Sequence, residues 1–356
     1  MTLILSNDDV DSVLRMDRCI DALEESYREI AAGRAVTRQR SDSLVGAGDG
    51  AVYGFKTMDG VIPSQGYAAV RLNSDIIRWP TVAGTQRRVK QPLAPGGRYT
   101  GLVLLFSTKT GEPLAIMPDG VMQRMRVGAT NGLGVKYMAR EDARSVAILG
   151  SGWQAGSQLM AVCAVRRIRE IRCYSPNPDN RERFAAEMSD FLGVAILPQD
   201  SAEVAIAGSD IVLCSSNSIE PIFFRDDMSP GMHVSSIKMP EIDHEALRRA
   251  DRVGLHMGHQ TPITVMAADL EVPDHAKGRG WGARHGYDFD SCPKLPDMVS
   301  GAVRGRERAD EITCFINDLG LGLQFAVIGG IAYEAAVEKG LGHELPTDWF
   351  TEDVHP

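Results

Sequence analysis

Residues 145–165 read SVAILGSGWQAGSQLMAVCAV, and this stretch decides the fold. Its first six residues form the short apolar run typical of a buried strand, and its last thirteen have the composition of a helix. The turn between them has the form G-x-G-x-x-A, with Gly150, Gly152 and Ala155 at the spaced positions. The first glycine permits a tight turn, the second lets the backbone approach a pyrophosphate, and the small third residue lets helix and strand pack closely. The stretch therefore predicts a dinucleotide-binding turn; the alternative is a purely structural glycine turn.

Strand-like and helical runs alternate after this turn. Such alternation is typical of a parallel sheet with right-handed crossovers. We therefore predict an α/β fold class with a Rossmann-type doubly wound parallel sheet. The strand-like runs are EIRCYS (170–175), VAILP (194–198), DIVLCSS (210–216), HVSSI (233–237) and RVGLHMG (252–258), and PDNRERFAAEMSDFL (178–192) is a helical run.

The rest of the chain predicts a second, discontinuous domain. A length of 356 residues suggests two domains on a prior of about 150 residues each. The segments 8–32, 122–140 and 317–340 have helical patterns, and the clearest strands between the first two are YGFKTM (53–58), YAAVRLNS (67–74) and TGLVLLFST (100–108). We expect a NAD(P)-binding Rossmann domain over 128–319, and an α+β domain made of 1–127 and 320–356. The two inserts, 78–98 and 273–296, are expected to shape the substrate pocket.

Composition excludes several classes of function. The chain has 38 Lys and Arg against 47 Asp and Glu, a net charge of −9, which argues against general nucleic-acid binding and against adhesion to an anionic membrane. It has no apolar run of the roughly 20 residues that span a bilayer. Six scattered cysteines without a C-x-x-C pair indicate free thiols and a cytoplasmic protein. His256 and His259 lack an evident third ligand, so no metal site is expected.

The second strand of the Rossmann unit should end in the group that reads the adenosine ribose. A carboxylate there favours NAD through the ribose 2′-hydroxyl. Here the strand ends in Cys173-Tyr-Ser-Pro-Asn177, without a carboxylate. Ser175, Asn177 and Arg181 can accommodate a 2′-phosphate by hydrogen bonds and charge, which favours NADP (NADPH) over NAD. The alternative is that Asn177 only begins the following helix.

Cationic side chains occur at unusual places in the first domain. Lys56 and Arg71 lie inside strand-like runs, Arg40 precedes the first strands, and Arg126 lies in a helical run. A cation among apolar neighbours is costly to bury unless it meets an anion, and a substrate carboxylate is a natural partner. The alternative is a solvated strand face or pairing with nearby aspartates such as Asp42 and Asp75.

Several motifs together resemble one known family, the ornithine cyclodeaminase/mu-crystallin family. The resemblance runs through nearly the whole chain and implies a homodimer, whose first domain supplies the substrate pocket and a shared β interface. The motifs are KTGEPLAIM (109–117), QRMRVGATNGLGVKYMAR (123–140), VAILGSGWQAGSQ (146–158) and DEITCFINDLGLGLQFA (310–326).

The resemblance also implies roles for single residues. Arg126 matches the family arginine that contacts the substrate carboxylate, and Arg40 is similar to the arginine before the first strands. The family lysine that contacts substrate matches Lys56 by local sequence and Arg71 by strand order. Further cofactor contacts implied by the resemblance are those of Trp153, Gln154, Ser215, Ser216, Ile237, Lys238, Asp318 and Leu319.

One departure from the family pattern affects the expected reaction. Members that cyclise ornithine carry an aspartate just after the strand that matches HVSSI, whereas this chain reads KMPEID at 238–243. Glu241 and Asp243 are possible substitutes, although both look like the start of a helix, where acidic residues are favoured anyway.

We therefore expect a NAD(P)H-dependent oxidoreductase that acts on the C–N bond of an amino or imino acid, next to its carboxylate. Arg126 and Arg40 are expected to hold the carboxylate, with Lys56 or Arg71 completing the clamp. Lys56 is a candidate proton donor. The catalytic candidates are Lys56, Arg71 and Arg126. The alternatives are an ornithine cyclodeaminase-type lyase and a non-catalytic NADPH-binding protein.

Overall fold

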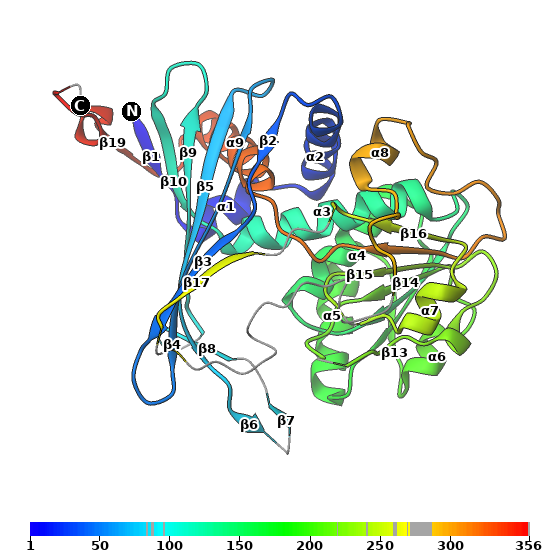
Figure 1. Ribbon diagram of the computed structural model, residues 1–356. Helices are drawn as coiled ribbons and strands as arrows, with labels where there is room; N and C mark the ends of the chain where they lie inside the picture. Colours follow the sequence, from blue (N-terminus) through cyan, green and yellow to red (C-terminus); the bar gives the residue numbers. More distant parts are fainter. Residues whose placement is uncertain are drawn as a thin grey trace.

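The computed structural model has two lobes that lie side by side, each built on its own sheet (Figure 1). Residues 83–84, 87–88, 95–96, 219, 240, 259–261, 269, 271–286 and 355–356 lie outside the description that follows. Most of the predicted insert 273–296, and a smaller part of the insert 78–98, therefore lies outside the described residues.

The first lobe contains a ten-stranded mixed sheet. Its main path is β17-β3-β4-β5-β9-β10-β1-β19, while β2 pairs with β4 and β8 with β5. A small ribbon pairs β6 (Thr81–Val82) with β7 (Thr85–Gln86). The strands of the large sheet are β1 (Thr2–Ile4), β2 (Val36–Thr37), β3 (Ser41–Gly46), β4 (Val52–Ile62), β5 (Tyr67–Arg78), β8 (Val89–Gln91), β9 (Thr100–Ser107), β10 (Pro113–Pro118), β17 (Ile263–Met266) and β19 (His343–Leu345).

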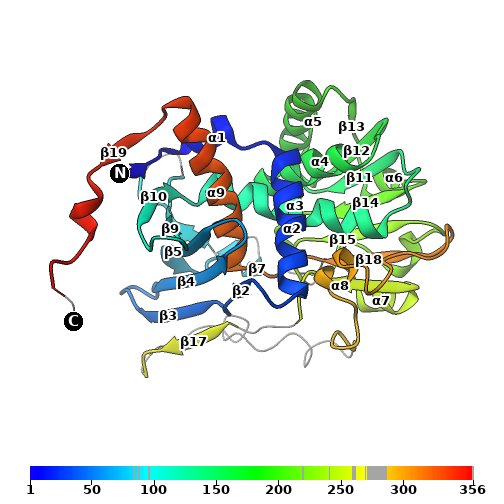
Figure 2. The same cartoon turned by 90° about the horizontal axis from the view of Figure 1, so that it is seen from above.

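Alternation along β4 and β5 decides which side chains face the protein interior. Every second residue of both strands is buried, as the two-residue period of a strand requires. Lys56 and Arg71 therefore share an inner face with Met58 and Ile62 of the core. Helices α2 (Met16–Ala31) and α9 (Gly322–Lys339) lie between this face and the second lobe (Figure 2).

The prediction of one continuous helix over 8–32 was wrong. The structure has α1 (Asn7–Val13) and α2, separated by Leu14 and Arg15 in extended conformation. The break lets Val13, Leu14 and Met16 all reach the core of this lobe. Ser6 caps α1 by accepting a hydrogen bond from the backbone N–H of Asp9.

The second lobe confirms the predicted Rossmann-type sheet. All six strand pairings are parallel, in the order β13-β12-β11-β14-β15-β18-β16. The strands are β11 (Ser145–Leu149), β12 (Glu170–Tyr174), β13 (Ile196–Pro198), β14 (Ile211–Cys214), β15 (His233–Ser236), β16 (Arg252–Leu255) and β18 (Thr313–Ile316). The helices of this lobe are α4 (Trp153–Val165), α5 (Pro178–Leu192), α6 (Ala202–Ile206), α7 (His244–Arg249) and α8 (Leu295–Val299), and it has a short 3₁₀ turn at Arg225–Asp227. A second 3₁₀ turn, Thr347–Phe350, follows β19 of the first lobe.

One strand crosses the predicted division between the domains. β17 falls within 128–319, yet it pairs in parallel with β3 of the ten-stranded sheet. The chain therefore returns once to the first lobe before β18. We keep the division into 128–319 against 1–127 and 320–356 as a proposal.

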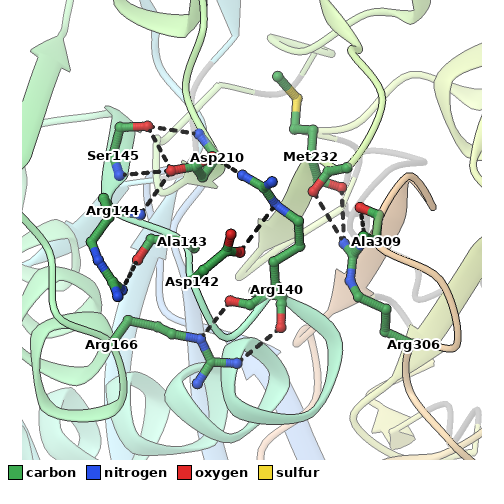
Figure 3. Close-up of polar contacts among 12 residues, drawn as sticks. Arg140, Asp142, Ala143, Arg144, Ser145, Arg166, Asp210, Met232, Arg306 and Ala309 are labelled. Carbon is green, nitrogen blue, oxygen red and sulfur yellow. Dashed lines mark hydrogen bonds and ion pairs between the residues drawn. The ribbon is translucent and has the colours of Figure 1, made fainter.

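Helix α3 (Gly120–Met138) joins the two lobes, and glycines let it pack closely. A Cβ on Gly128 would lie 2.6 Å from the carbonyl oxygen of Ser157 in α4, and one on Gly134 would lie 2.2 Å from the Phe315 ring. Arginines then satisfy the carbonyls at its C-terminal end (Figure 3). The Arg166 guanidinium donates to the carbonyls of Val135, Lys136, Ala139 and Arg140 at 2.8–3.0 Å.

We expect Gly322→Ala to destabilise the protein, because α9 begins directly on the backbone of β4. A Cβ at Gly322 would lie 2.0 Å from the carbonyl carbon of Asp59. Overpacking of this kind costs about 1–3 kcal/mol, and here the obstacle is backbone. The control is Gly46→Ala, where a Cβ meets nothing within 4 Å. Urea unfolding should separate the two variants; equal midpoints would contradict the close approach of α9.

Candidate active site

The turn after β11 has the geometry that its sequence predicts. Gly150 has φ +131°, and a Cβ there would lie 2.0 Å from the carbonyl oxygen of Ser215. Gly152 precedes α4, and a Cβ there would meet nothing within 4 Å. Among the described residues no side chain caps the N-terminus of α4, so the N–H groups of Trp153 and Gln154 are open to an anion, whereas that of Ala155 donates to the carbonyl of Gly152. Ala155 is fully buried, as close packing of helix and strand requires.

Trp153 and Gln154 form the first turn of α4. The Trp153 side chain is exposed, and its ring lies 4.1 Å from the guanidinium carbon of Arg124. Gln154 Oε1 accepts a hydrogen bond from Ser157 Oγ at 3.3 Å. Both residues therefore border the open space beside Gly152, where the diphosphate is expected from the family resemblance.

Hydroxyl groups gather at the end of β12. Ser175 Oγ lies 2.8 Å from Ser151 Oγ of the glycine turn. Asn177 caps α5 by accepting from the N–H of Asn180 at 2.9 Å. Arg181 is buried, and its guanidinium donates to the carbonyl of Ser175 at 3.1 Å and to Asp200 at 2.8 Å. The structure therefore gives Arg181 a contact that supports this turn, and its role toward a 2′-phosphate stays a prediction.

The loops after β14 and β15 are held together by a buried carboxylate. Glu241 accepts from the backbone N–H and the hydroxyl of Ser216 at 2.6 and 2.8 Å, and burial raises its pKa. Ser236 Oγ donates to the carbonyl of Lys238 at 2.5 Å. These contacts place Ser215, Ser216, Ile237 and Lys238 at the same edge of the sheet as Gly150.

Both acidic residues that might replace the cyclising aspartate have structural partners. Glu241 is fully buried beneath the Ser216 loop. Asp243 caps α7 by accepting from the N–H of Glu245 at 2.9 Å. Both contacts of Glu241 use Oε1, and its Oε2 is buried without a hydrogen-bond partner among the described residues.

Asp318 and Leu319 follow β18 at this same edge. Asn317 fixes the start of the loop by donating to the carbonyl of Val127 in α3 at 3.1 Å. Asp318 is half-buried. Desolvation raises its pKa to about 7, an effect that its own backbone N–H partly opposes.

Three of the four predicted clamp cations have an acid partner. Lys56 Nζ lies 2.6 Å from Asp75 Oδ2. Arg71 lies 2.6 Å from Asp119 and also donates to Gln123 at 2.9 Å. Arg40 forms a bidentate pair with Asp42, both contacts being 2.8 Å.

Arg126 is the exception. Its side chain is buried, with 8% exposed, and it forms no ion pair within the described parts of the chain. One guanidinium nitrogen donates to Gln324 at 3.2 Å, while its Nε has no partner. Arg71 and Arg126 each lie 5.5 Å from the centre of the Phe325 ring. Burial and the Arg71 charge lower the pKa of Arg126 to about 10, so it remains charged at neutral pH.

Arg126 also lies against the cofactor-side loop. A Cβ on Gly320 would lie 3.1 Å from an Arg126 guanidinium nitrogen. Gly320 is the residue after Leu319, so the guanidinium and the Asp318–Leu319 loop are neighbours. The structure thus brings together Arg71, Arg126 and this loop, whereas Lys56 pairs with Asp75 farther along the same sheet face.

Sequence reasoning missed a buried network next to Arg126. It consists of Tyr27, Thr130, His256 and Gln324, which are at most 1% exposed. His256, weighed above as a metal ligand, instead contacts Tyr27 and the carbonyl of Leu319; His259 lies outside the described residues. Within the described ranges, no three His, Cys, Asp or Glu side chains are placed to share a metal ion. The sequence feature that could have indicated this network is the polar residue Gln324 at the start of an otherwise apolar helix.

A cavity of about 1080 Å³ lies elsewhere, between α2, the C-terminal ends of α3 and α4, and the loop after α8. Its lining includes Tyr137, Arg144 and Arg304, and none of the predicted site residues. It is therefore separate from the site described here.

Family comparison agrees with this geometry. The model of the ornithine cyclodeaminase/mu-crystallin family matches residues 1–340. The chain belongs to this family. A Δ1-pyrroline-2-carboxylate reductase from Bacillus cereus (strain ATCC 10987) is 26% identical over 350 residues, which cover 96% of this chain and 99% of that protein.

Two solved structures extend the comparison. Δ1-Pyrroline-2-carboxylate reductase from Thermococcus litoralis, in complex with NADH and L-proline, has a TM-score of 0.74 and 27% identity, covering 97% of this chain and all of that one. An archaeal alanine dehydrogenase dimer with bound NAD has the same fold, with a TM-score of 0.74 and 22% identity, covering 97% and 99%. These three relatives are two reductases and a dehydrogenase, and both solved ones hold a nicotinamide dinucleotide. An ornithine cyclodeaminase from Agrobacterium fabrum also matches, with 24% identity over 339 residues that cover 93% of this chain and 82% of that protein.

We expect Gly152→Ala to weaken dinucleotide binding without destabilising the fold. A Cβ at Gly152 meets no protein atom within 4 Å, but it occupies space needed for the close approach of a pyrophosphate. Titration of NADH and NADPH, followed by nucleotide fluorescence, should show affinity reduced at least tenfold. The melting temperature should change little. Unchanged affinity would contradict a pyrophosphate site at this turn.

Proposed function

We propose that the protein is a NAD(P)H-dependent reductase of 2-imino acids, which in reverse dehydrogenates the corresponding amino acid. The observation that carries this proposal is the buried Arg126 guanidinium, which no acid partners in the described chain and whose Nε is free. A buried charge of this kind is stabilised by an anionic ligand. Because Arg126 neighbours the Asp318–Leu319 loop, that anion would bind beside the nicotinamide side of the cofactor.

The chain's own residues explain how a substrate would be oriented. Arg126 binds the carboxylate through its free Nε edge, and Arg71 supplies the second charge over the Phe325 ring. We therefore assign Arg71, rather than Lys56, to the position of the family lysine. Arg40 is more exposed and completes the rim of the site. A carboxylate fixed in this way holds the adjacent C–N carbon in place, and positioning supplies much of the rate.

The residues around the Gly150 turn fit a nicotinamide dinucleotide. The uncapped N-terminus of α4 and the open space at Gly152 suit the pyrophosphate, and Asp318 offers a carboxylate to ribose hydroxyls. Bound NAD(P)H supplies the hydride. An iminium substrate becomes a neutral amine on accepting hydride, whereas a neutral imine also needs one proton. We propose Lys56 as the source of that proton, although it is ion-paired with Asp75 and lies farther along the sheet face than Arg71.

NADP(H) is the cofactor that we propose. The end of β12 presents Ser175, Ser151 and the Asn177 amide rather than a carboxylate. A carboxylate at this place would repel a 2′-phosphate, and hydroxyl groups can donate to it.

Cyclodeamination is the second candidate, because it needs the same carboxylate clamp and the same cofactor. It also needs a carboxylate to deprotonate an amine, and the complete burial of Glu241 together with the helix-capping contact of Asp243 favours the reductase. A non-catalytic NADPH-binding protein is the third candidate; it would not need a free cationic edge at Arg126.

We further propose that the protein is a homodimer. None of the described α-helices covers the outer face of the ten-stranded sheet (Figure 2), which presents exposed Phe55, Leu102, Ile263 and Val265. Large exposed apolar faces mark association surfaces, and a twofold interface uses the same face of both copies. The solved archaeal relative is a dimer.

We propose the cytoplasm as its location. All six cysteines are free, and burial raises the pKa of the Cys19 and Cys314 thiols to about 12. Among the described helices, none is both long and apolar enough to cross a bilayer.

Activity tests the proposal directly. NADPH and NADH oxidation at 340 nm is to be measured with Δ1-pyrroline-2-carboxylate, with pyruvate plus ammonium and with oxaloacetate plus ammonium. We expect the protein to turn over at least one of these substrates, and to do so faster with NADPH than with NADH. Arg126→Met should lower kcat/KM at least 100-fold, since it removes a charge-assisted bidentate contact. The control Arg124→Met removes a neighbouring cation that lies over Trp153. Ammonia release from ornithine without net absorbance change would instead support cyclodeamination.

Asp318→Asn should have opposite effects on stability and on cofactor binding. The carboxyl pKa is raised to about 7 in the folded protein, above its unfolded value, so ionisation at pH 8 destabilises the fold. The amide removes that charge, and the melting temperature at pH 8 should rise. Cofactor affinity should fall, because a carboxylate accepts ribose hydroxyls better.

The same variant tests the pH dependence of binding. In the wild type, cofactor affinity should increase as the pH rises from 6 to 8, because the acceptor form of Asp318 becomes populated. This dependence should be weaker in Asp318→Asn. A wild-type affinity that is flat over this range would contradict the ribose contact.

A further inference from the structure

The buried network beside Arg126 joins elements from both lobes. Tyr27 comes from α2, Thr130 from α3, Gln324 from α9, and His256 directly follows β16 of the Rossmann-type sheet. Polar side chains buried this deeply need their hydrogen bonds satisfied, so each partner restrains the others.

One carbonyl group decides the direction of the hydrogen bonds. His256 Nδ1 lies 3.0 Å from the carbonyl oxygen of Leu319, which can only accept, so Nδ1 carries the proton. Burial and the nearby Arg126 charge lower the pKa of His256 to about 3, so the ring is neutral and Nε2 is an acceptor. The Tyr27 hydroxyl, 2.5 Å from Nε2, therefore donates to His256.

Gln324 continues the network as far as Arg126. Its Nε2 donates to the Tyr27 hydroxyl at 3.1 Å and to Thr130 Oγ1 at 2.7 Å. Its Oε1 accepts from Arg126 at 3.2 Å and from the backbone N–H of Leu321 at 3.0 Å. The amide uses all four of its hydrogen-bonding positions. It cannot turn without losing contacts to the loop and to Arg126 together.

We propose that Tyr27, His256 and Gln324 are positioning residues that hold Arg126 in register with the Leu319–Leu321 loop. The inference rests on the proposed function, in which Arg126 binds the carboxylate and this loop borders the cofactor. Because one network holds the loop at Leu319 and at Leu321, as well as Arg126, it sets the separation between the bound carboxylate and the nicotinamide side. Rates of hydride transfer depend steeply on that separation.

Tyr27→Phe tests the kinetic consequence, since it removes one hydroxyl and keeps the ring. Its matched control is Tyr137→Phe, whose hydroxyl also links α3 to α2, through Glu24. With NADPH and the best substrate of the panel, kcat/KM should fall at least tenfold in Tyr27→Phe and stay within twofold in Tyr137→Phe. Comparable losses in the two variants would overturn the proposal.

A double mutant separates positioning from general loss of stability. If Tyr27 acts through Arg126, Tyr27→Phe should cost clearly less in an Arg126→Lys background than in the wild type. If Tyr27→Phe lowers kcat/KM by the same factor in the Arg126→Lys background as in the wild type, the link to Arg126 is overturned.

The cofactor side is tested without any substrate, so the result does not depend on the proposed reaction. If the wild type turns over no member of the panel, the reductase proposal fails, and titration of NADPH and NADH still tests the network. The Kd should rise at least threefold in Tyr27→Phe and stay unchanged in Tyr137→Phe.

Two variants of His256 test its contact with the carbonyl of Leu319. His256→Asn keeps a donor near the place of Nδ1 and should retain more cofactor affinity than His256→Leu, which keeps none. Equal affinities in these two variants would overturn the role of the Leu319 contact.

Discussion

The Arg126 guanidinium is a positive charge held inside the protein without a carboxylate of the described chain to neutralise it. Such a charge is expensive to desolvate, and Arg71 nearby adds to the cost. Neutral groups offset part of it: the Gln324 amide oxygen and the face of the Phe325 ring. Much of the surrounding structure supports this arrangement, since α2, α3, α9 and the loop after β18 all contribute to it. A site built in this way is stabilised when an anion arrives.

The acid partners of the other cations have a complementary effect. Asp119 pairs with Arg71, and Asp75 is shared by Lys56 and Lys90, so among these buried or half-buried cations Arg126 is the one without a carboxylate of the described chain. Arg71 can therefore assist a carboxylate without adding a second unpaired charge. This arrangement supports the proposal that one anionic group binds at Arg126.

Local sequence predicted the local structures well. The glycine turn, the parallel sheet and the placing of Lys56 and Arg71 within strands follow from patterns only a few residues long, whereas β18 was not predicted and the burial of the two cations was left open. The network behind Arg126 was out of reach, because Tyr27 and Gln324 are 297 residues apart and only the packing of α2 against α9 brings them together. The inward turn of Arg181 depends on contacts to Ser175 and Asp200, which the sequence pattern at 173–177 does not reveal.

The close seating of α9 on β4 has a consequence for biosynthesis. All seven parallel strands have been synthesised once Ile316 has left the ribosome. The inner face of the ten-stranded sheet, most of which is translated earlier, is covered only after α9 has been synthesised as far as Lys339. The nucleotide-binding lobe can therefore complete itself before the lobe that precedes it. A nascent chain stalled before α9 would expose Met58, Ile62 and Ala69 to water, which makes the newly made N-terminal half the part most in need of a chaperone.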